Sequence, residues 1–144
     1  MHDLRQRTKA YALRVVNLVQ SLPRDLTTDV LARQLLRCGT SVGANYRSAC
    51  RAKSQADFIA KMSIVEEEAD ESVFWLELLV ESGVLSQSRL ADLIQEGNEL
   101  VAIAVSSIRT ARSSSNHNGH KELRERSIPY MDEPDSLELS DFIS

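Results

Sequence analysis

The sequence contains few residues that interrupt helices, with three prolines and five glycines among its 144 residues. This scarcity argues against an all-β chain, which needs turn residues at short intervals. No run of about 18 apolar residues is present, so no segment is predicted to span a membrane. The first residues also lack the apolar segment of a signal peptide. A hydrophobic content of 42% is enough for the core of one domain.

Cysteine and histidine are also scarce, with two and three residues respectively. Cys38 and Cys50, if they share a helix, lie about 18 Å apart, which is beyond the reach of a disulfide. We expect both to be reduced packing residues of a cytoplasmic protein. The three histidines fall outside the four predicted helices, and no P-loop, nucleophile elbow, dinucleotide fingerprint or helical Glu-x-x-His is present. The sequence therefore predicts no enzyme, no cofactor and no metal site.

Four amphipathic segments make up most of the chain, over about 4–22, 29–52, 54–82 and from after Ser86 to Arg112. Apolar residues recur at alternating steps of three and four, which places them on one side of each helix. These stripes are Leu4, Thr8, Tyr11, Val15, Leu18 and Leu22; Leu31, Leu35, Cys38, Val42, Asn45 and Ala49; Phe58, Met62, Val65, Ala69, Ser72, Leu76 and Val80; and Leu90, Ile94, Gly97, Val101, Ala104 and Ile108. The short connections predict an all-α, antiparallel up-and-down four-helix bundle.

Capping residues support the helix ends. Thr27 or Thr28 is expected to cap the second helix. Ser54 is expected to cap the third, with Asp57 three residues later. Gly83 is expected just past the end of the third helix.

We divide the chain into a bundle over 1–112 and a polar, acidic tail over 113–144. Residues 113–119 have the composition of a linker. We expect the tail to be mostly mobile. The alternative is that its apolar residues form a segment that docks on the bundle, namely Leu137, Leu139, Phe142 and Ile143.

Charge is distributed unevenly along the bundle. Residues 4–61 carry a net charge of +8, and residues 62–112 carry −7. We expect the carboxylates on one side of the third helix to pair with a basic helix of the same or another copy. These carboxylates belong to Glu66, Asp70, Glu77 and Glu81.

A row of arginines lies opposite the core stripe of the second helix, namely Arg33, Arg37, Arg47 and Arg51. Such a row can bind the phosphates of a nucleic acid. The alternative is a face that is solvated or paired with carboxylates.

Two further faces predict self-association. The third helix carries a second apolar side, formed by Ile64, Phe74, Trp75 and Leu78. A helix of a monomeric bundle needs one apolar side, so the second predicts a subunit interface. The alternative is that a neighbouring helix or the tail covers Trp75. On the second helix, Gly39, Gly43 and Tyr46 form a close helix contact, which we assign to the oligomer interface.

Asn45 lies on an apolar stripe and is expected to need a hydrogen-bond partner. Glu71 is the candidate for that role, or else belongs to the interface. We interpret Asn45 as a structural polar residue that fixes register or oligomer state.

Residues 40–47 (TSVGANYR), 68–72 (EADES) and 75–79 (WLELL), with Ser54, Asp57-Phe58 and Lys61-Met62, resemble one family. It comprises the four-helix-bundle proteins encoded in intervening sequences of bacterial 23S rRNA genes, also called S23 ribosomal proteins. The resemblance covers about residues 4–112. It implies a bundle that assembles into a ring of five, with no established catalysis. It also implies a relation to the accessory variability protein of diversity-generating retroelements, a pentamer that binds nucleic acid and a reverse transcriptase.

Two functions follow from these features. The first is a non-enzymatic, homo-oligomeric scaffold or interaction protein, pentameric by the resemblance, whose main partner is a second copy of itself. The second is an oligomer that binds RNA or another nucleic acid through the arginine row. Its partner is then RNA or an enzyme that acts on nucleic acid. The neutral bundle and a pI near 5.4 favour the first.

Overall fold

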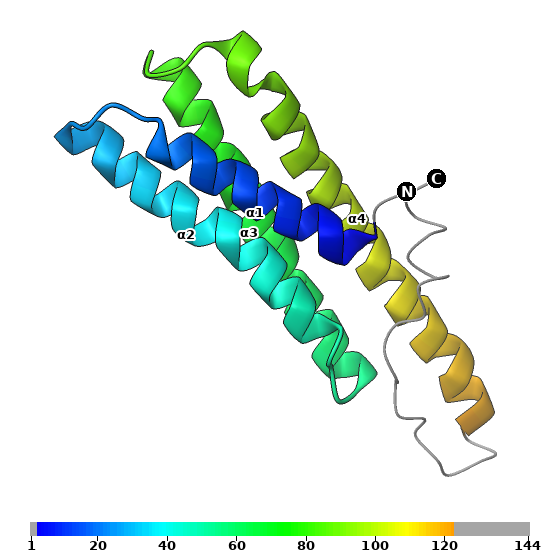
Figure 1. The fold of residues 1–144 in the computed structure, drawn as a ribbon. Coiled ribbons are helices and arrows are strands. Elements are labelled where there is room, and N and C mark those ends of the chain that lie inside the picture. Colours follow the sequence, from blue (N-terminus) through cyan, green and yellow to red (C-terminus); the bar gives the residue numbers. More distant parts are fainter. Residues whose placement is uncertain (1–2, 123–144) are drawn as a thin grey trace.

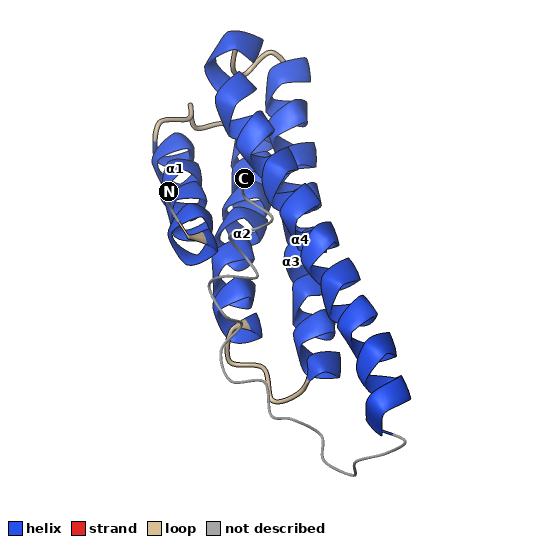
Figure 2. Ribbon diagram, turned by 90° about the vertical axis from the view of Figure 1, so that its right-hand side faces the viewer, coloured by secondary structure: helices blue, strands red, loops and turns tan. Residues whose placement is uncertain are grey.

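The computed structural model describes residues 3–122, with side chains described as far as residue 116. It contains four α-helices: α1 (Leu4–Gln20), α2 (Leu26–Ala49), α3 (Gln55–Glu81) and α4 (Gln87–Glu122). They alternate in direction and form an antiparallel bundle in which α2 packs on α3 and α3 on α4 (Figure 1, Figure 2). No strand occurs within residues 3–122, so the predicted all-α fold class is confirmed.

The predicted core stripes of α1 and α3 face the interior. Those of α2 and α4 are displaced, since the predicted Leu31, Asn45, Ile94 and Val101 are only half-buried, whereas Ala32, Leu93, Leu100 and Ile103 are buried. All six residues of the α1 stripe are buried, and Leu35, Met62 and Leu90 on the other helices are 1% exposed or less. The polar members of the stripes have partners. The hydroxyls of Tyr11 and Ser72 lie 2.6 Å apart across the core, and Ser72 also donates to the carbonyl of Ala69. Burial raises the pKa of Tyr11 to about 12, so its phenol stays protonated and serves as a structural hydrogen-bonding group.

The start of α2 differs from the prediction. Asp25, rather than Thr27 or Thr28, caps the helix, and its carboxylate accepts from the backbone N–H of Thr28 at 2.9 Å. The Thr28 hydroxyl, also 2.9 Å away, donates to the other carboxylate oxygen, so Thr28 supports the cap. Aspartate caps as well as serine does and better than threonine, and it adds a favourable interaction with the helix dipole.

This cap makes part of the stability depend on pH. Hydrogen bonds from the backbone and side chain of Thr28 lower the pKa of Asp25 in the folded chain. Because the pKa of Asp25 is lower in the folded chain, the stabilisation by its ionised cap is fully present above the pKa of the unfolded chain, near 4. It is lost as pH falls through the pKa of Asp25 in the folded chain. Asp25→Ala should therefore lower the melting temperature by a few degrees at pH 7. The deficit should shrink as pH falls below about 4, in melts followed by circular dichroism. Asp25→Asn is the control, because it keeps a capping side chain. A melting-temperature deficit of Asp25→Ala that did not depend on pH would contradict this assignment.

The other expected caps are present. Ser54 accepts from the backbone N–H of Asp57, and Ser86 accepts from that of Arg89 at the start of α4. Gly83, with φ of 82°, follows the end of α3 as predicted. The N–H groups of Gly83 and Val84 donate to the carbonyls of Val80 and Leu79, which ends α3 in a Schellman motif.

The end of the bundle differs from the prediction. We expected α4 to end at Arg112 and a linker to follow, but α4 continues to Glu122. The serines and asparagines of this segment are weak helix formers. An existing helix nevertheless extends at little cost, because each added residue gains one backbone hydrogen bond without a new nucleus. The apolar residues expected to dock from the tail lie outside the described residues.

Ion pairs join helices that are distant in sequence. Arg7 of α1 pairs with Glu96 at 3.0 Å and with Glu99 at 2.8 Å, both on α4. Arg37 of α2 pairs with Glu68 at 3.2 Å and with Glu71, both on α3. The expected pairing of a basic with an acidic helix is thus present, through Glu68 and Glu71 rather than the four carboxylates named from the sequence.

No helix within the described residues has the length and apolar character needed to cross a membrane.

Candidate functional site

One candidate site is the second apolar side of α3, which we call the α3 apolar face and define as Ile64, Phe74, Trp75 and Leu78. Ile64 is 40% exposed and Phe74 is 50% exposed, whereas Trp75 and Leu78 are half-buried. The rings of Phe74 and Trp75 meet edge to face, with centroids 5.0 Å apart and planes inclined at 69°. The described part of the chain therefore leaves this aromatic pair partly uncovered.

Trp75 spans the boundary between this face and the interior. Its side chain packs against the core, and its indole Nε1 is buried without a hydrogen-bond partner among the described residues. The alternative reading, in which a neighbouring helix covers Trp75, therefore holds only for part of the ring. Half of the neighbouring Phe74 remains exposed among the described residues.

The small-residue face of α2 lies inside the subunit. A Cβ added to Gly39 would lie 2.9 Å from both methyl carbons of Val15, and one added to Gly43 would lie 3.3 Å from the carbonyl oxygen of Thr8. Tyr46 is 1% exposed. The expected close helix contact is present, but α1 of the same chain makes it. The assignment of Gly39 and Tyr46 to the oligomer interface is therefore wrong, because both residues are already buried within the single chain.

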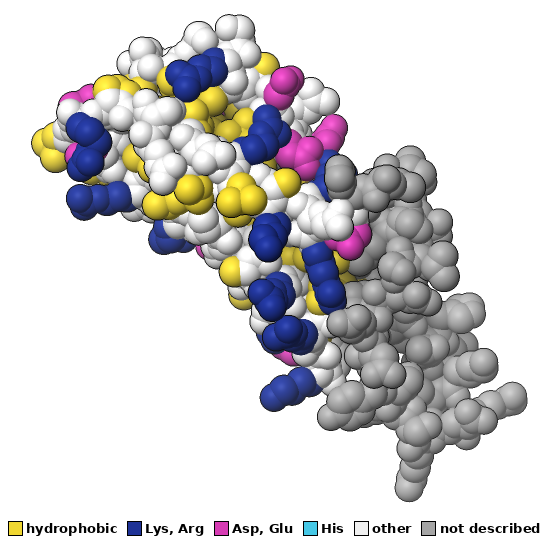
Figure 3. All heavy atoms as spheres, viewed as in Figure 1, with side chains coloured by type: hydrophobic (Ala, Val, Ile, Leu, Met, Phe, Trp, Pro, Cys, Tyr) yellow, Lys and Arg dark blue, Asp and Glu magenta, His cyan; other side chains and the backbone are white. Residues whose placement is uncertain are grey.

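The arginine row of α2 is divided. Arg37 pairs with two carboxylates of α3 and thus fits the alternative reading of an ion-paired face. Arg33, Arg47 and Arg51 are exposed. In Figure 3, lysine and arginine side chains dominate the surface over the C-terminal half of α2 and the adjoining part of α1.

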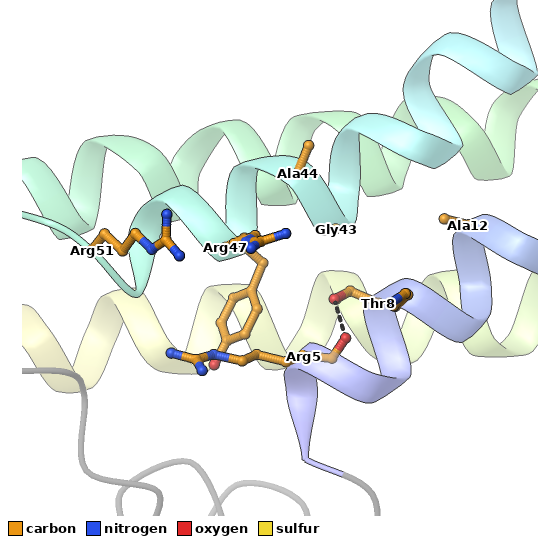
Figure 4. Close-up of a pocket in the computed structure, with 9 residues that line it drawn as sticks. Arg5, Thr8, Ala12, Gly43, Ala44, Arg47 and Arg51 are labelled. Carbon is orange, nitrogen blue, oxygen red and sulfur yellow. Dashed lines mark hydrogen bonds between the residues drawn. The ribbon is translucent and has the colours of Figure 1, made fainter.

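A groove of about 500 Å³ runs between α1 and α2 at this basic surface. We call it the basic groove and define it by its four cationic side chains, which are Arg5, Lys9, Arg47 and Arg51. Small residues line the rest of the groove, including Ala12 on α1 and Gly43 and Ala44 on α2 (Figure 4). The groove brings together two arginines that the sequence singled out and two cations of α1 that it did not. The spacing of Arg5 and Lys9, one helical turn apart, was the feature of the sequence that could have predicted a second basic row on α1.

The basic groove can hold an anion but lacks groups that would transform one. None of its lining residues is Asp, Glu, His or Cys. The Thr8 hydroxyl donates to the carbonyls of Leu4 and Arg5, at 2.8 and 3.1 Å. Burial raises the pKa of Tyr46. The groove thus offers neither a general base nor an activated nucleophile.

Asn45 finds its partner within its own helix. Its side-chain amide donates to the carbonyl and the hydroxyl of Ser41, both at 2.8 Å. Glu71, expected as a possible partner, pairs with Arg37 instead. The side-chain N–H donors of Asn45 are thus satisfied within α2.

Cys38 and Cys50 are free and buried. Burial raises the pKa of the Cys38 thiol to about 12, which keeps it neutral and unreactive. No group of three or more potential metal ligands occurs among the described His, Cys, Asp and Glu residues.

Comparison with known proteins places this bundle in a family. The family model described as 23S rRNA-intervening sequence protein matches residues 2–106, which span α1, α2, α3 and more than half of α4. The chain belongs to this family. A crystal structure from Bacteroides thetaiotaomicron VPI-5482, described as a protein with unknown function from the S23 ribosomal protein family, is 36% identical. The similarity covers 72% of this chain and 96% of that one, with a TM-score of 0.68. No curated protein shows significant similarity.

The family membership confirms the resemblance seen in the motifs of α2 and α3. It assigns no reaction to the chain, and nothing in the described residues points to catalysis. The two surfaces defined above are therefore the features from which a function can be argued.

Proposed function

We propose that this member of the 23S rRNA-intervening sequence protein family is a non-catalytic interaction protein that self-associates through the α3 apolar face. The observation that supports this most directly is the half-exposed Phe74 packed edge-on against Trp75. Exposed aromatic clusters are typical of protein interfaces, and tryptophan is enriched among residues that dominate binding energy. The resemblance drawn from the motifs implies a ring of five copies. The remaining surface of each copy then faces outward for a further partner.

The test is the solution mass of the full chain by light scattering. A ring of five 16.1-kDa chains has a mass of about 80 kDa. Phe74→Glu should reduce the mass to that of a single chain, because burying an unpaired carboxylate in an apolar contact costs more than the contact contributes. The fold should survive, since half of the Phe74 side chain already meets solvent.

Leu13→Glu is the matched control. Leu13 is 55% exposed, similar to Phe74, but lies on α1. It should leave the mass unchanged. A wild-type mass of 16.1 kDa, or equal dissociation by Leu13→Glu, would contradict self-association through α3.

A further inference from the structure

The basic groove is built from two short rows of cations. Arg5 and Lys9 are four residues apart on α1, and Arg47 and Arg51 are four residues apart on α2. Each pair thus spans about one helical turn, roughly 5–6 Å along its helix. Two parallel rows over a single groove place positive charge on both of its sides.

The floor of the groove allows close approach. Gly43 carries no side chain at the point where α2 meets the backbone of Thr8, and a Cβ there would lie 3.3 Å from the Thr8 carbonyl oxygen. Ala12 and Ala44 are the shortest side chains that could flank it (Figure 4). A ligand can therefore lie over this helix contact, beside short side chains and within reach of long cationic side chains on either side.

Four described carboxylates pair with arginines that do not line the groove. Glu96 and Glu99 pair with Arg7, and Glu68 and Glu71 pair with Arg37. Helix α1 contains no Asp or Glu, and Asp3 before it accepts from the backbone N–H of Gln6 at 2.8 Å and caps the helix. Among the described residues, no carboxylate lines the groove itself. The fold thus concentrates positive charge here within a chain of net charge −4.

The shape of the groove selects among anions. Its volume of about 500 Å³ is far larger than a single phosphate requires, and its cations are spread over one turn of each of two helices. It also offers no exposed aromatic surface on which a base could stack, because Tyr46 is 1% exposed. These features suit a chain of phosphates contacted along its backbone, without reading of the bases.

We propose that the basic groove binds the phosphodiester backbone of a single nucleic-acid strand, with Arg5, Lys9, Arg47 and Arg51 as its phosphate contacts. The groove lies within one chain, so this site does not depend on self-association through α3. Binding of this kind is electrostatic, independent of base sequence and sensitive to salt.

The test uses the full-length protein and short labelled oligouridylate and oligoadenylate RNAs, followed by fluorescence anisotropy between about 50 and 200 mM salt. Both RNAs should bind with affinities within a few-fold of each other. The variant Lys9→Gln/Arg47→Gln/Arg51→Gln should weaken binding by about tenfold or more at low salt. It should also reduce the slope of log affinity against log salt by about 2, since each single-strand phosphate contact contributes about 0.7.

The matched control is Arg14→Gln/Arg33→Gln/Arg109→Gln, which removes the same charge from exposed positions outside the groove. All six side chains are exposed, so both variants should keep the wild-type melting temperature. Equal losses of affinity in the two variants would overturn the proposal, because they would indicate a diffuse charge effect. A strong preference for one base, or binding of inorganic polyphosphate without binding of RNA, would overturn it as well.

Discussion

Replacing Tyr46 by alanine is expected to lower the free energy of unfolding by about 3–5 kcal/mol, the range for truncating a buried aromatic side chain. Tyr46 is among the largest fully buried side chains, with 1% of its surface exposed. Truncation removes its contacts and leaves a cavity between α1 and α2, and the neighbouring helices can close that cavity only in part. Urea denaturation followed by circular dichroism measures the change.

Phe74→Ala is the informative comparison, because it truncates another aromatic side chain that is 50% exposed. It should change the solution mass more than the stability of the single chain. If Tyr46→Ala instead altered the mass with less than about 1 kcal/mol lost from folding, Tyr46 would belong to an interface, as the sequence pattern first indicated.

A comparably large effect is expected at Gly97, where α4 packs tightly against Val73 and Tyr11. A Cβ at this position would lie 2.6 Å from Cγ2 of Val73 and 2.9 Å from the hydroxyl oxygen of Tyr11. Both separations are shorter than van der Waals contact. Gly97→Val should therefore cost about 3 kcal/mol through overpacking, even though glycine is about 1 kcal/mol worse than alanine inside a helix.

A double-mutant cycle isolates the cause. Val73→Ala removes the methyl group nearest to the new side chain, so it should recover part of the stability lost in Gly97→Ala. The two substitutions should then be non-additive by about 0.5–3 kcal/mol. Asn98→Ala, at the adjacent exposed position, is the control and should be nearly neutral. Strict additivity between positions 73 and 97 would contradict the proposed steric conflict.

Periodicity was sufficient to predict most of this fold. The stripe of α1 is buried, and so is that of α3 except for the half-buried Val80, because three-and-four spacing keeps these residues on one side of each helix. Gly83 was predictable for a similar reason, since few residues other than glycine tolerate φ of 82° at a helix end. Local chemistry and packing agree at these positions.

The errors arise where a helical wheel identifies a face but not what covers it. The face of Gly39 and Tyr46 is apolar because α1 of the same chain lies on it, and the pattern alone does not distinguish α1 from a second copy. The basic groove was missed for a related reason. It exists only where Gly43 brings α2 against Thr8, which places residues about 40 positions apart beside each other.

The chain contains a single tryptophan, and the α3 apolar face contains it. Indole emission shifts to shorter wavelength as water is excluded, and Trp75 is half-buried with a half-exposed Phe74 at its edge. Dilution of the unlabelled protein therefore offers an optical readout of whether α3 is covered, with no background from any other indole. The molecule has a built-in reporter at the position where its proposed assembly begins.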